Sequence, residues 1–322
     1  MGNQRSALSE VARRRVLHAE EYYDRLEYEL DPLGGYRLRR NQRLPHITIN
    51  GQGFRGEPFT GEEPVLLLGD SVTFGVGAGG DEERFSRFLS QAIGRPVADA
   101  SVRAYRVFQQ YGQLPSLLER LPRVRWVIVW FGYADLLFWM LSGGCVEGAF
   151  QFEKKYGASS GQSNGSLPGW SRLARLLGVP ASSGRFGKED RARETGSVED
   201  LAAHVALYLQ AIRDLCGARG IEVRNLLQPF VRRPPQEEEL KFLADSYDEK
   251  SKQRCGVGWY EASDRFTRAL QKGNGEGRSP RILDCQGLVT EEIFLDQVHL
   301  KVGGLERLAS RLAEGEEWRS IG

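Results

Sequence analysis

The sequence predicts an α/β protein built on a parallel sheet that helices cover on both faces. Two continuous apolar runs, residues 65–68 and 124–131, are typical of strands that are buried on both sides. Stretches with helical spacing alternate with these runs and with shorter strand-like stretches toward the C-terminus. Because parallel strands are joined by crossover helices, this alternation indicates a parallel sheet between two helical layers. Functional residues are then expected at the carboxyl ends of the strands.

The individual elements follow from local patterns. Residues 1–30 show apolar residues at helical spacing among charges, so we expect an N-terminal helix that Asp31-Pro32 ends. Residues 47–50 alternate and indicate a short edge strand. The other expected strands are residues 65–68, 97–101, 124–131, 223–228 and 282–283, and the other expected helices are residues 84–93, 105–121 with a kink or break at Pro115, 198–219, two stretches between 237 and 271, and 304–312.

The chain divides into a lead-in and one main domain. We expect residues 1–63 to form the N-terminal helix and a turn-rich lead-in, and residues 64–322 to form the α/β domain. Residues 141–200 interrupt the alternation and contain Gly/Ser-rich stretches, so they indicate a long insertion. Insertions of this length are usually functional lids or linkers. As a lid, the insertion would lie over or beside the site.

Composition excludes several classes of protein. The 322 residues carry a formal net charge of +1, which gives no strong overall electrostatic attraction to nucleic acid or to an anionic membrane. We find no apolar stretch of about 18 residues and no secretory signal, so we expect a cytoplasmic protein without a membrane span. The four cysteines form no CxxC pair, which predicts reduced thiols and no metal site. No cofactor is expected, and the oligomeric state stays open.

The tripeptide Gly69-Asp70-Ser71 stands where a buried strand should end and a helix should begin. A serine hydroxyl there would project from the strand end, and the helix N-terminus would offer free N–H groups. Such residues are also common as simple helix N-caps. The position therefore makes Ser71 a candidate nucleophile that needs a second group to support it.

The second group is His299, with Asp296 three residues before it. A serine hydroxyl is a weak nucleophile at neutral pH without a base, and the base is usually oriented by a carboxylate. Of the four histidines, only His299 is expected at the end of a sheet strand. The alternative is a solvated loop with an incidental histidine. We predict Ser71 as nucleophile, His299 as base and Asp296 as its orienter.

Together these motifs resemble those of the SGNH (GDSL-like) hydrolases. The stretch PVLLLGDSVTFG over residues 64–75 resembles the first sequence block of that family, and DQVHL over residues 296–300 resembles the last. The stretch NGQGFRG over residues 50–56 is similar to the lead-in of many bacterial members. The resemblance implies a flavodoxin-like three-layer α/β/α fold. It also implies a serine hydrolase that cleaves ester bonds of an acylated small molecule or carbohydrate through an acyl-enzyme.

The family builds an oxyanion hole from the backbone N–H of the nucleophile, the backbone N–H of a glycine in the second block, and an asparagine side chain in the third. By resemblance these positions are Ser71, Ala104 and Ala134. Ala104 keeps its backbone N–H, whereas Ala134 has lost the side-chain donor. Asp135, beside it, is retained and is expected to be structural.

Three explanations of the missing asparagine are open. Another side chain can replace it, the nearest in sequence being Arg103, Tyr105 and Tyr133. Alternatively, the chain is an engineered knock-out, or it has drifted toward binding or another acyl chemistry. Removing one oxyanion donor typically lowers the rate by about 10²–10³.

Two other classes of function compete with the hydrolase. An acyltransferase or a catalytically impaired binding protein would fit the loss at Ala134. A nucleotide-binding protein would fit the GxGxxG pattern over residues 75–80, with Asp99 as a ribose-binding acid. That pattern should directly follow the strand, yet Asp70 to Phe74 intervene, so a surface loop is the better interpretation.

Overall fold

The computed structural model describes residues 25–31, 33–59, 63–146, 195–231, 258–272, 281–289, 294, 298–315 and 318. At its centre lies a five-stranded sheet of order β6-β5-β7-β8-β9, in which every neighbouring pair is parallel. The strands are β5 Val65–Leu68, β6 Val97–Asp99, β7 Trp126–Phe131, β8 Glu222–Leu227 and β9 Ile282–Asp284. These are the five main-sheet strands that the sequence predicts; the bounds of β5 match, and those of the other four differ by one or two residues.

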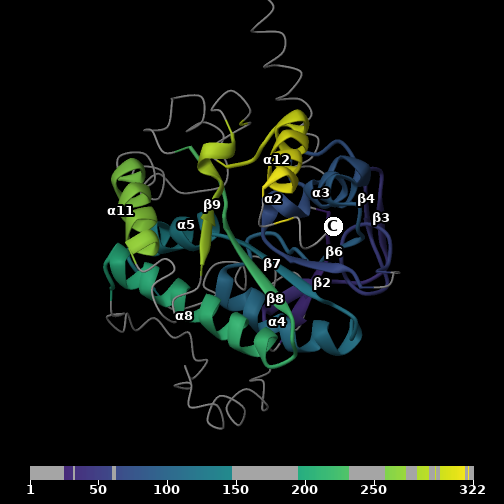
Figure 1. Ribbon diagram of the computed structural model, residues 1–322, viewed down its shortest axis with the longest axis horizontal. Helices are drawn as coiled ribbons and strands as arrows, with labels where there is room; N and C mark the ends of the chain where they lie inside the picture. The colour runs from purple at the N-terminus through teal and green to yellow at the C-terminus, as the bar shows by residue number, and fades with distance from the viewer. Residues whose placement is uncertain are drawn as a thin grey trace, which may run out of the picture.

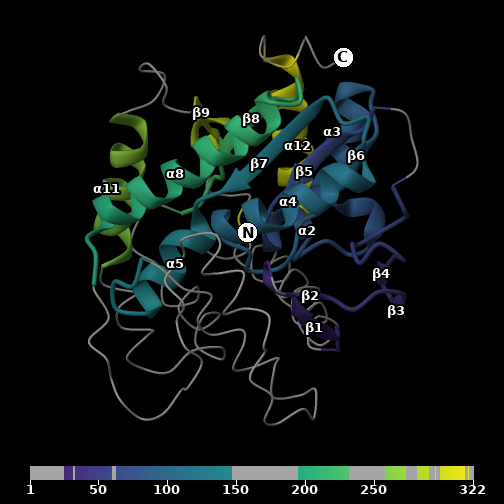
Figure 2. The same cartoon turned by 90° about the horizontal axis from the view of Figure 1, so that it is seen from below.

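Helices cover both faces of this sheet (Figures 1 and 2). On one face α3 (Phe85–Ile93) packs against α12 (Val302–Glu314). On the other face α8 (Val198–Gly217) packs against α4 (Val107–Arg120) and α11 (Trp259–Lys272). The predicted class, a parallel sheet between two helical layers, is confirmed. Helix α4 continues through Pro115 instead of breaking there.

The core explains why the two strongest apolar runs are central strands. All four residues of β5 are buried, and so are the last five of β7. These strands are neighbours in the middle of the sheet, with Val65 opposite Trp126 and Leu68 opposite Val129. Because both faces of a central parallel strand meet helices, neither strand shows the alternation of a half-exposed strand.

The predicted N-terminal helix is wrong at its C-terminal end, and residues 1–24 lie outside the described residues. β1 (Tyr28–Asp31) and β2 (Gly35–Leu38) form an antiparallel hairpin. The Asp31 carboxylate oxygen Oδ1 accepts hydrogen bonds from the N–H groups of Leu33, at 2.9 Å, and Gly34, at 2.7 Å, which stabilises the turn. The rings of Tyr28 and Tyr36 then pack edge to face across the strands.

The predicted edge strand at residues 47–50 is a strand, but it does not join the main sheet. β4 (Ile47–Ile49) pairs antiparallel with β3 (Gln42–Leu44) in a second small hairpin. Ile47 and Ile49 are buried and pack on the shared core. The lead-in therefore consists of two hairpins attached to the α/β domain.

The expected insertion leaves the domain after α5 (Tyr133–Leu141), and its residues 147–194 lie outside the described residues, as does the lid interpretation. Its two ends meet: Cys145 and Thr195 form a β-bridge, and the Gly196 N–H donates to the Gly144 carbonyl at 2.9 Å. Among the described helices, none has the length and apolar character needed to span a bilayer.

The described cysteines, Cys145, Cys216 and Cys285, are free thiols, and the last two are buried. Burial raises the pKa of the Cys216 thiol to about 11, so this thiol is protonated and unreactive near neutral pH.

Candidate active site

Ser71 lies at the carboxyl end of β5, as the first residue of the short helix α2 (Ser71–Phe74). Asp70 caps this helix, because its carboxylate accepts a hydrogen bond from the Val72 N–H at 2.9 Å. At Gly69, a Cβ atom would lie 2.0 Å from Thr73 Oγ1 and 3.0 Å from Ser101 Oγ. No residue larger than glycine fits at this strand end without displacing that pair of hydroxyls.

His299 contacts Ser71 directly. The two side chains are 228 positions apart in sequence, yet His299 Nε2 lies 2.8 Å from Ser71 Oγ. His299 stands in the loop that leads into α12, where Leu300 forms a β-bridge with Phe294. A serine hydroxyl at hydrogen-bond distance from an imidazole is the geometry that general-base activation requires. Asp296, the predicted orienter, lies outside the described residues.

Ala104 adopts an unusual backbone conformation beside Ser71. Its φ of +62° is in the left-handed region, which favours glycine. The loop that carries it is fixed to the end of β5, because the Val102 N–H donates to the Gly69 carbonyl at 3.3 Å. Within the described part of the chain, the backbone N–H groups of Ser71 and Ala104 have no hydrogen-bond partner. Both are therefore available to an oxygen atom of a ligand.

Ala134 is buried in the first turn of α5, just beyond the carboxyl end of β7. Gly132, which precedes this helix, has a φ of +123°, and a Cβ atom there would lie 2.5 Å from Leu227 Cδ1. The tight connection brings the first turn of α5 to the end of the sheet where Ser71 lies. At this place the Ala134 methyl group offers no hydrogen-bond donor.

Asp135, in the first turn of α5, contacts the start of α4. Its Oδ1 accepts a hydrogen bond from the Val107 N–H at 3.2 Å, at the start of α4. The guanidinium of Arg106 lies 3.5 Å from the same oxygen atom, and both side chains are buried. Burial raises the pKa of Asp135, and the positive charge of Arg106 opposes that shift.

The three candidate replacement donors have different surroundings. The Tyr105 hydroxyl donates to the Tyr36 carbonyl oxygen in the N-terminal hairpin, so this donor is already used. The Tyr133 ring packs against Trp259, with ring centres 5.2 Å apart, and against Phe230. Arg103 is half-buried, and its carbonyl oxygen accepts a hydrogen bond from the Tyr36 hydroxyl at 2.7 Å.

A buried polar pair that the sequence analysis missed lies beside Ser71. Asp70 is 1% exposed and Gln228, directly after β8, is 0% exposed. Burial raises the pKa of Asp70 to about 6, while the Val72 N–H, His299 and the Gln228 side chain lower it. Among the described residues, Asp70 Oδ2 and both polar atoms of the Gln228 amide have no hydrogen-bond partner within 3.5 Å.

The only sequence signal for Gln228 is its place at the end of a predicted strand. A polar residue there, before Pro229, is also what an ordinary loop start would contain. Its proximity to Asp70 comes from the order of strands in the sheet, which the sequence pattern does not give.

The glycine-rich stretch over residues 75–80 does not form the dinucleotide-binding fingerprint, the rival interpretation to a surface loop. Gly75 ends α2 instead of opening a helix after the strand. Its carbonyl oxygen accepts a hydrogen bond from the buried Arg55 guanidinium at 3.0 Å, and a Cβ atom at Gly75 would lie 2.6 Å from Arg84 Cγ. Gly75 makes room for two buried arginines. The described residues also contain no cluster of three or more potential metal ligands.

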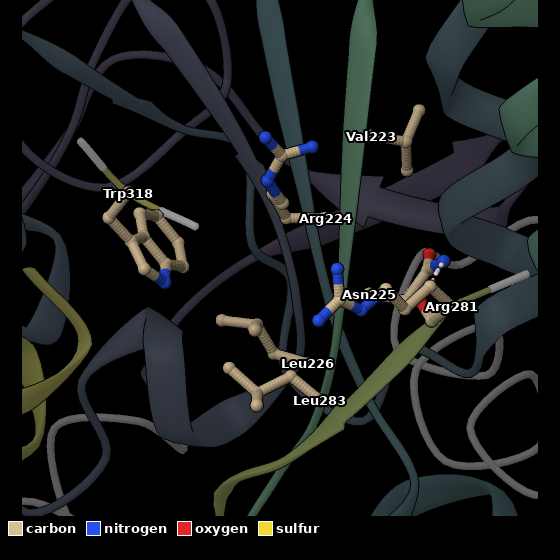
Figure 3. Close-up of a pocket in the computed structure, with 7 residues that line it drawn as sticks. All are labelled: Val223, Arg224, Asn225, Leu226, Arg281, Leu283 and Trp318. Atoms are coloured by element: carbon tan, nitrogen blue, oxygen red, sulfur yellow. Dashed lines mark hydrogen bonds between the residues drawn. The ribbon is translucent and has the colours of Figure 1, made fainter. Parts of the chain in front are cut away.

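A separate cavity of about 160 Å³ lies away from the strand ends (Figure 3). Its lining residues come from the body of β8, from the region of β9 and from near the C-terminus: Val223, Arg224, Asn225, Leu226, Arg281, Leu283 and Trp318. It contains neither Ser71 nor His299, so we do not assign it to the candidate active site.

No family model and no curated protein matches the chain. Solved structures that resemble it include a GDSL-like lipase from Bacteroides thetaiotaomicron, at 11% identity and a TM-score of 0.41, over 83% of this chain and 93% of that one. An acetyl-xylooligosaccharide esterase variant from Geobacillus has 12% identity and a TM-score of 0.41, over 78% and 93%. An acetyl xylan esterase has 12% identity and a TM-score of 0.39, over 80% and 100%. These likenesses are too distant to assign an activity, which has to be argued from the site.

Proposed function

We propose that this chain is a serine hydrolase that cleaves an ester (O-acyl) bond of a small molecule or carbohydrate, through an acyl-enzyme on Ser71. The observation that carries the proposal is the distance of 2.8 Å between Ser71 Oγ and His299 Nε2 at the carboxyl end of a parallel sheet. Sites of α/β sheets lie at that edge. The motifs around both residues and the free N–H groups beside them also support it.

In this mechanism His299 accepts the proton of the Ser71 hydroxyl as Oγ attacks the ester carbonyl carbon. Negative charge then develops on the carbonyl oxygen, and the N–H groups of Ser71 and Ala104 stabilise it. His299 returns the proton to the leaving alcohol, which departs and leaves the acyl group on Ser71. Water, deprotonated by His299, attacks the acyl-enzyme carbonyl carbon; the acid is released as His299 returns the proton to Ser71 Oγ. Asp296, three residues before His299, is the proposed orienter of the imidazole ring.

An acyltransferase is the second candidate, because the same acyl-enzyme can react with an alcohol or amine instead of water. The observation that favours it, or an impaired binding protein, is the alanine at position 134, since a weakened oxyanion site slows hydrolysis. Product analysis by mass spectrometry, with and without an added alcohol, separates the two enzymes. An acylated alcohol as the main product indicates transfer.

The nucleophile is tested with a fluorophosphonate probe. The wild-type chain should label once, at Ser71, and Ser71→Ala should abolish both labelling and hydrolysis of a short-chain aryl ester. Ser101→Ala is the matched control, because Ser101 is a buried serine near the same strand end whose hydroxyl donates to Thr73 Oγ1 at 2.7 Å. Circular dichroism checks that each variant is folded. Labelling that persists in folded Ser71→Ala would refute the proposal.

A further inference from the structure

We propose that Gln228 donates the side-chain hydrogen bond to the oxyanion that Ala134 cannot donate. This inference rests on the proposed hydrolase function and identifies one more catalytic residue for it. The site then has three donors: two backbone N–H groups, from Ser71 and Ala104, and one side-chain amide.

The register of the sheet places Gln228 next to the segment that carries Ala134. β7 and β8 are parallel neighbours, and their last residues, Phe131 and Leu227, stand opposite each other. The Gln228 N–H then donates to the Phe131 carbonyl oxygen at 3.0 Å. Gln228 therefore lies beside Gly132, the residue from which α5 and Ala134 begin. The Gln228 amide, at the end of β8, therefore lies at the same edge of the sheet as Ala134, where the family's asparagine amide is missing.

The Gln228 side chain is a buried donor without an acceptor. It is 0% exposed, and neither its Nε2 nor its Oε1 has a hydrogen-bond partner among the described residues. Leaving a buried amide unpaired costs free energy, so native proteins seldom do so without a functional reason. The amide is covered in the free protein, so it gains an acceptor only when a substrate oxygen displaces what covers it, and it then supplies the donor that the oxyanion requires.

The Gln228 amide lies close to Asp70, the residue that precedes the nucleophile. Asp70 directly precedes Ser71, its Oδ1 is used by the Val72 N–H, and its buried Oδ2 has no hydrogen bond within 3.5 Å. The Gln228 side chain is near enough to lower the pKa of this carboxyl. An amide nitrogen carries two N–H groups, so one can face Asp70 while the other faces the substrate oxygen. Asp70 is then a positioning residue.

The chemistry of the replacement is conservative. Glutamine and asparagine present the same neutral NH₂ group, and the longer glutamine side chain starts from the next strand. Of the other candidate donors, the Tyr105 hydroxyl is already bonded to the Tyr36 carbonyl, and the Tyr133 ring packs on Trp259. Gln228 therefore explains how the site tolerates alanine at position 134.

The test measures kcat and KM for a short-chain aryl ester. Gln228→Met keeps the length of the side chain and removes the donor, so kcat should fall about 10²–10³-fold while KM changes little. The double variant Gln228→Met with Ala134→Asn should have a kcat at least about tenfold higher than that of Gln228→Met. Ala134→Asn alone should change kcat much less. Gln210→Met, on the far-side helix α8, is the matched control and should leave both constants unchanged.

A second variant and the labelling of Ser71 distinguish failure of this inference from failure of the proposed function. Gln228→Leu is the second variant, because it keeps a side chain of similar volume that offers no hydrogen-bond donor in any protonation state; its kcat should fall as far. A folded Gln228→Met or Gln228→Leu that retains wild-type kcat overturns the inference, even if Ser71 labels normally. Failure of the wild-type chain to label at Ser71 overturns the proposed function, and the inference with it.

Discussion

Replacing Asp70 with asparagine should make the protein more stable at neutral pH than at acid pH, relative to the unchanged chain. Asp70 is 1% exposed, and burial raises its pKa from 3.8 to about 6. That difference corresponds to about 3 kcal/mol, at about 1.4 kcal/mol per pH unit. Because the folded-state pKa is raised, the contribution of Asp70 to stability is fully present below about pH 3.8 and is lost as the pH rises through about 6.

The assay is urea unfolding followed by circular dichroism at about pH 4, 5, 6 and 7, on the parent chain and on Asp70→Asn. Asparagine keeps the oxygen that accepts the Val72 N–H and cannot ionise. The free energy of unfolding of Asp70→Asn, minus that of the parent, should therefore rise by about 2.4 kcal/mol between about pH 4 and pH 7, and the full difference of about 3 kcal/mol is reached only from well below pH 3.8. A difference that stays constant over this range would refute the cost assigned to the buried carboxylate.

Asp200→Asn provides a control of opposite sign. Hydrogen bonds from the Ser197 hydroxyl and N–H hold the pKa of Asp200 below its usual value. Its carboxylate therefore contributes stability at neutral pH that is lost as the pH falls through the lowered pKa. Asp200→Asn should lose stability at pH 7, and the loss should shrink toward acid pH.

Three further predictions concern the same edge of the sheet. Ala104→Gly should raise the free energy of unfolding by about 1 kcal/mol, because glycine tolerates a φ of +62°; calorimetry that finds no gain would contradict this. Gly132→Ala should lower it by about 1–3 kcal/mol, since its φ is +123° and the new methyl group would meet Leu227; unchanged thermal unfolding would count against the tight connection. His299→Gln should lower kcat for an aryl ester by at least about 10²-fold and slow the labelling of Ser71, and brisk labelling would remove His299 from the mechanism.

Much of the fold is predictable because its signals are local. The apolar run of β5 and the one that contains β7 mark central strands by composition alone, and their order in a right-handed α/β topology leaves few alternatives. The N-terminal hairpin was missed because Leu26 and Leu30 also fit helical spacing. The turn at Asp31 and the packing of Tyr28 on Tyr36 decide in favour of strands, and that packing is a tertiary contact.

The residues of the candidate site also differ in how clearly the sequence indicates them. Ser71 and His299 stand in short motifs, so the sequence indicates both, and the structure brings their reactive atoms within hydrogen-bond distance. Gln228 has no motif. Its place beside Asp70 depends on the pairing of β7 with β8, and its unpaired amide is visible only when the surrounding residues are in place. Polar residues of this kind are recognised by their missing partners, which a sequence cannot display.

The paired ends of the insertion have a consequence for how the protein can change over time. Cys145 and Thr195 form a bridge, so the chain departs from and returns to the α/β domain at a single point. Lengthening or shortening the stretch between them alters only a closed excursion, and the entropy of closing such a loop grows slowly with its length. α5 and α8 keep their contacts with the α/β domain whatever the stretch between Cys145 and Thr195 contains. Residues 147–194 can therefore diverge, shrink or be exchanged between relatives while the sheet and Ser71 stay unchanged.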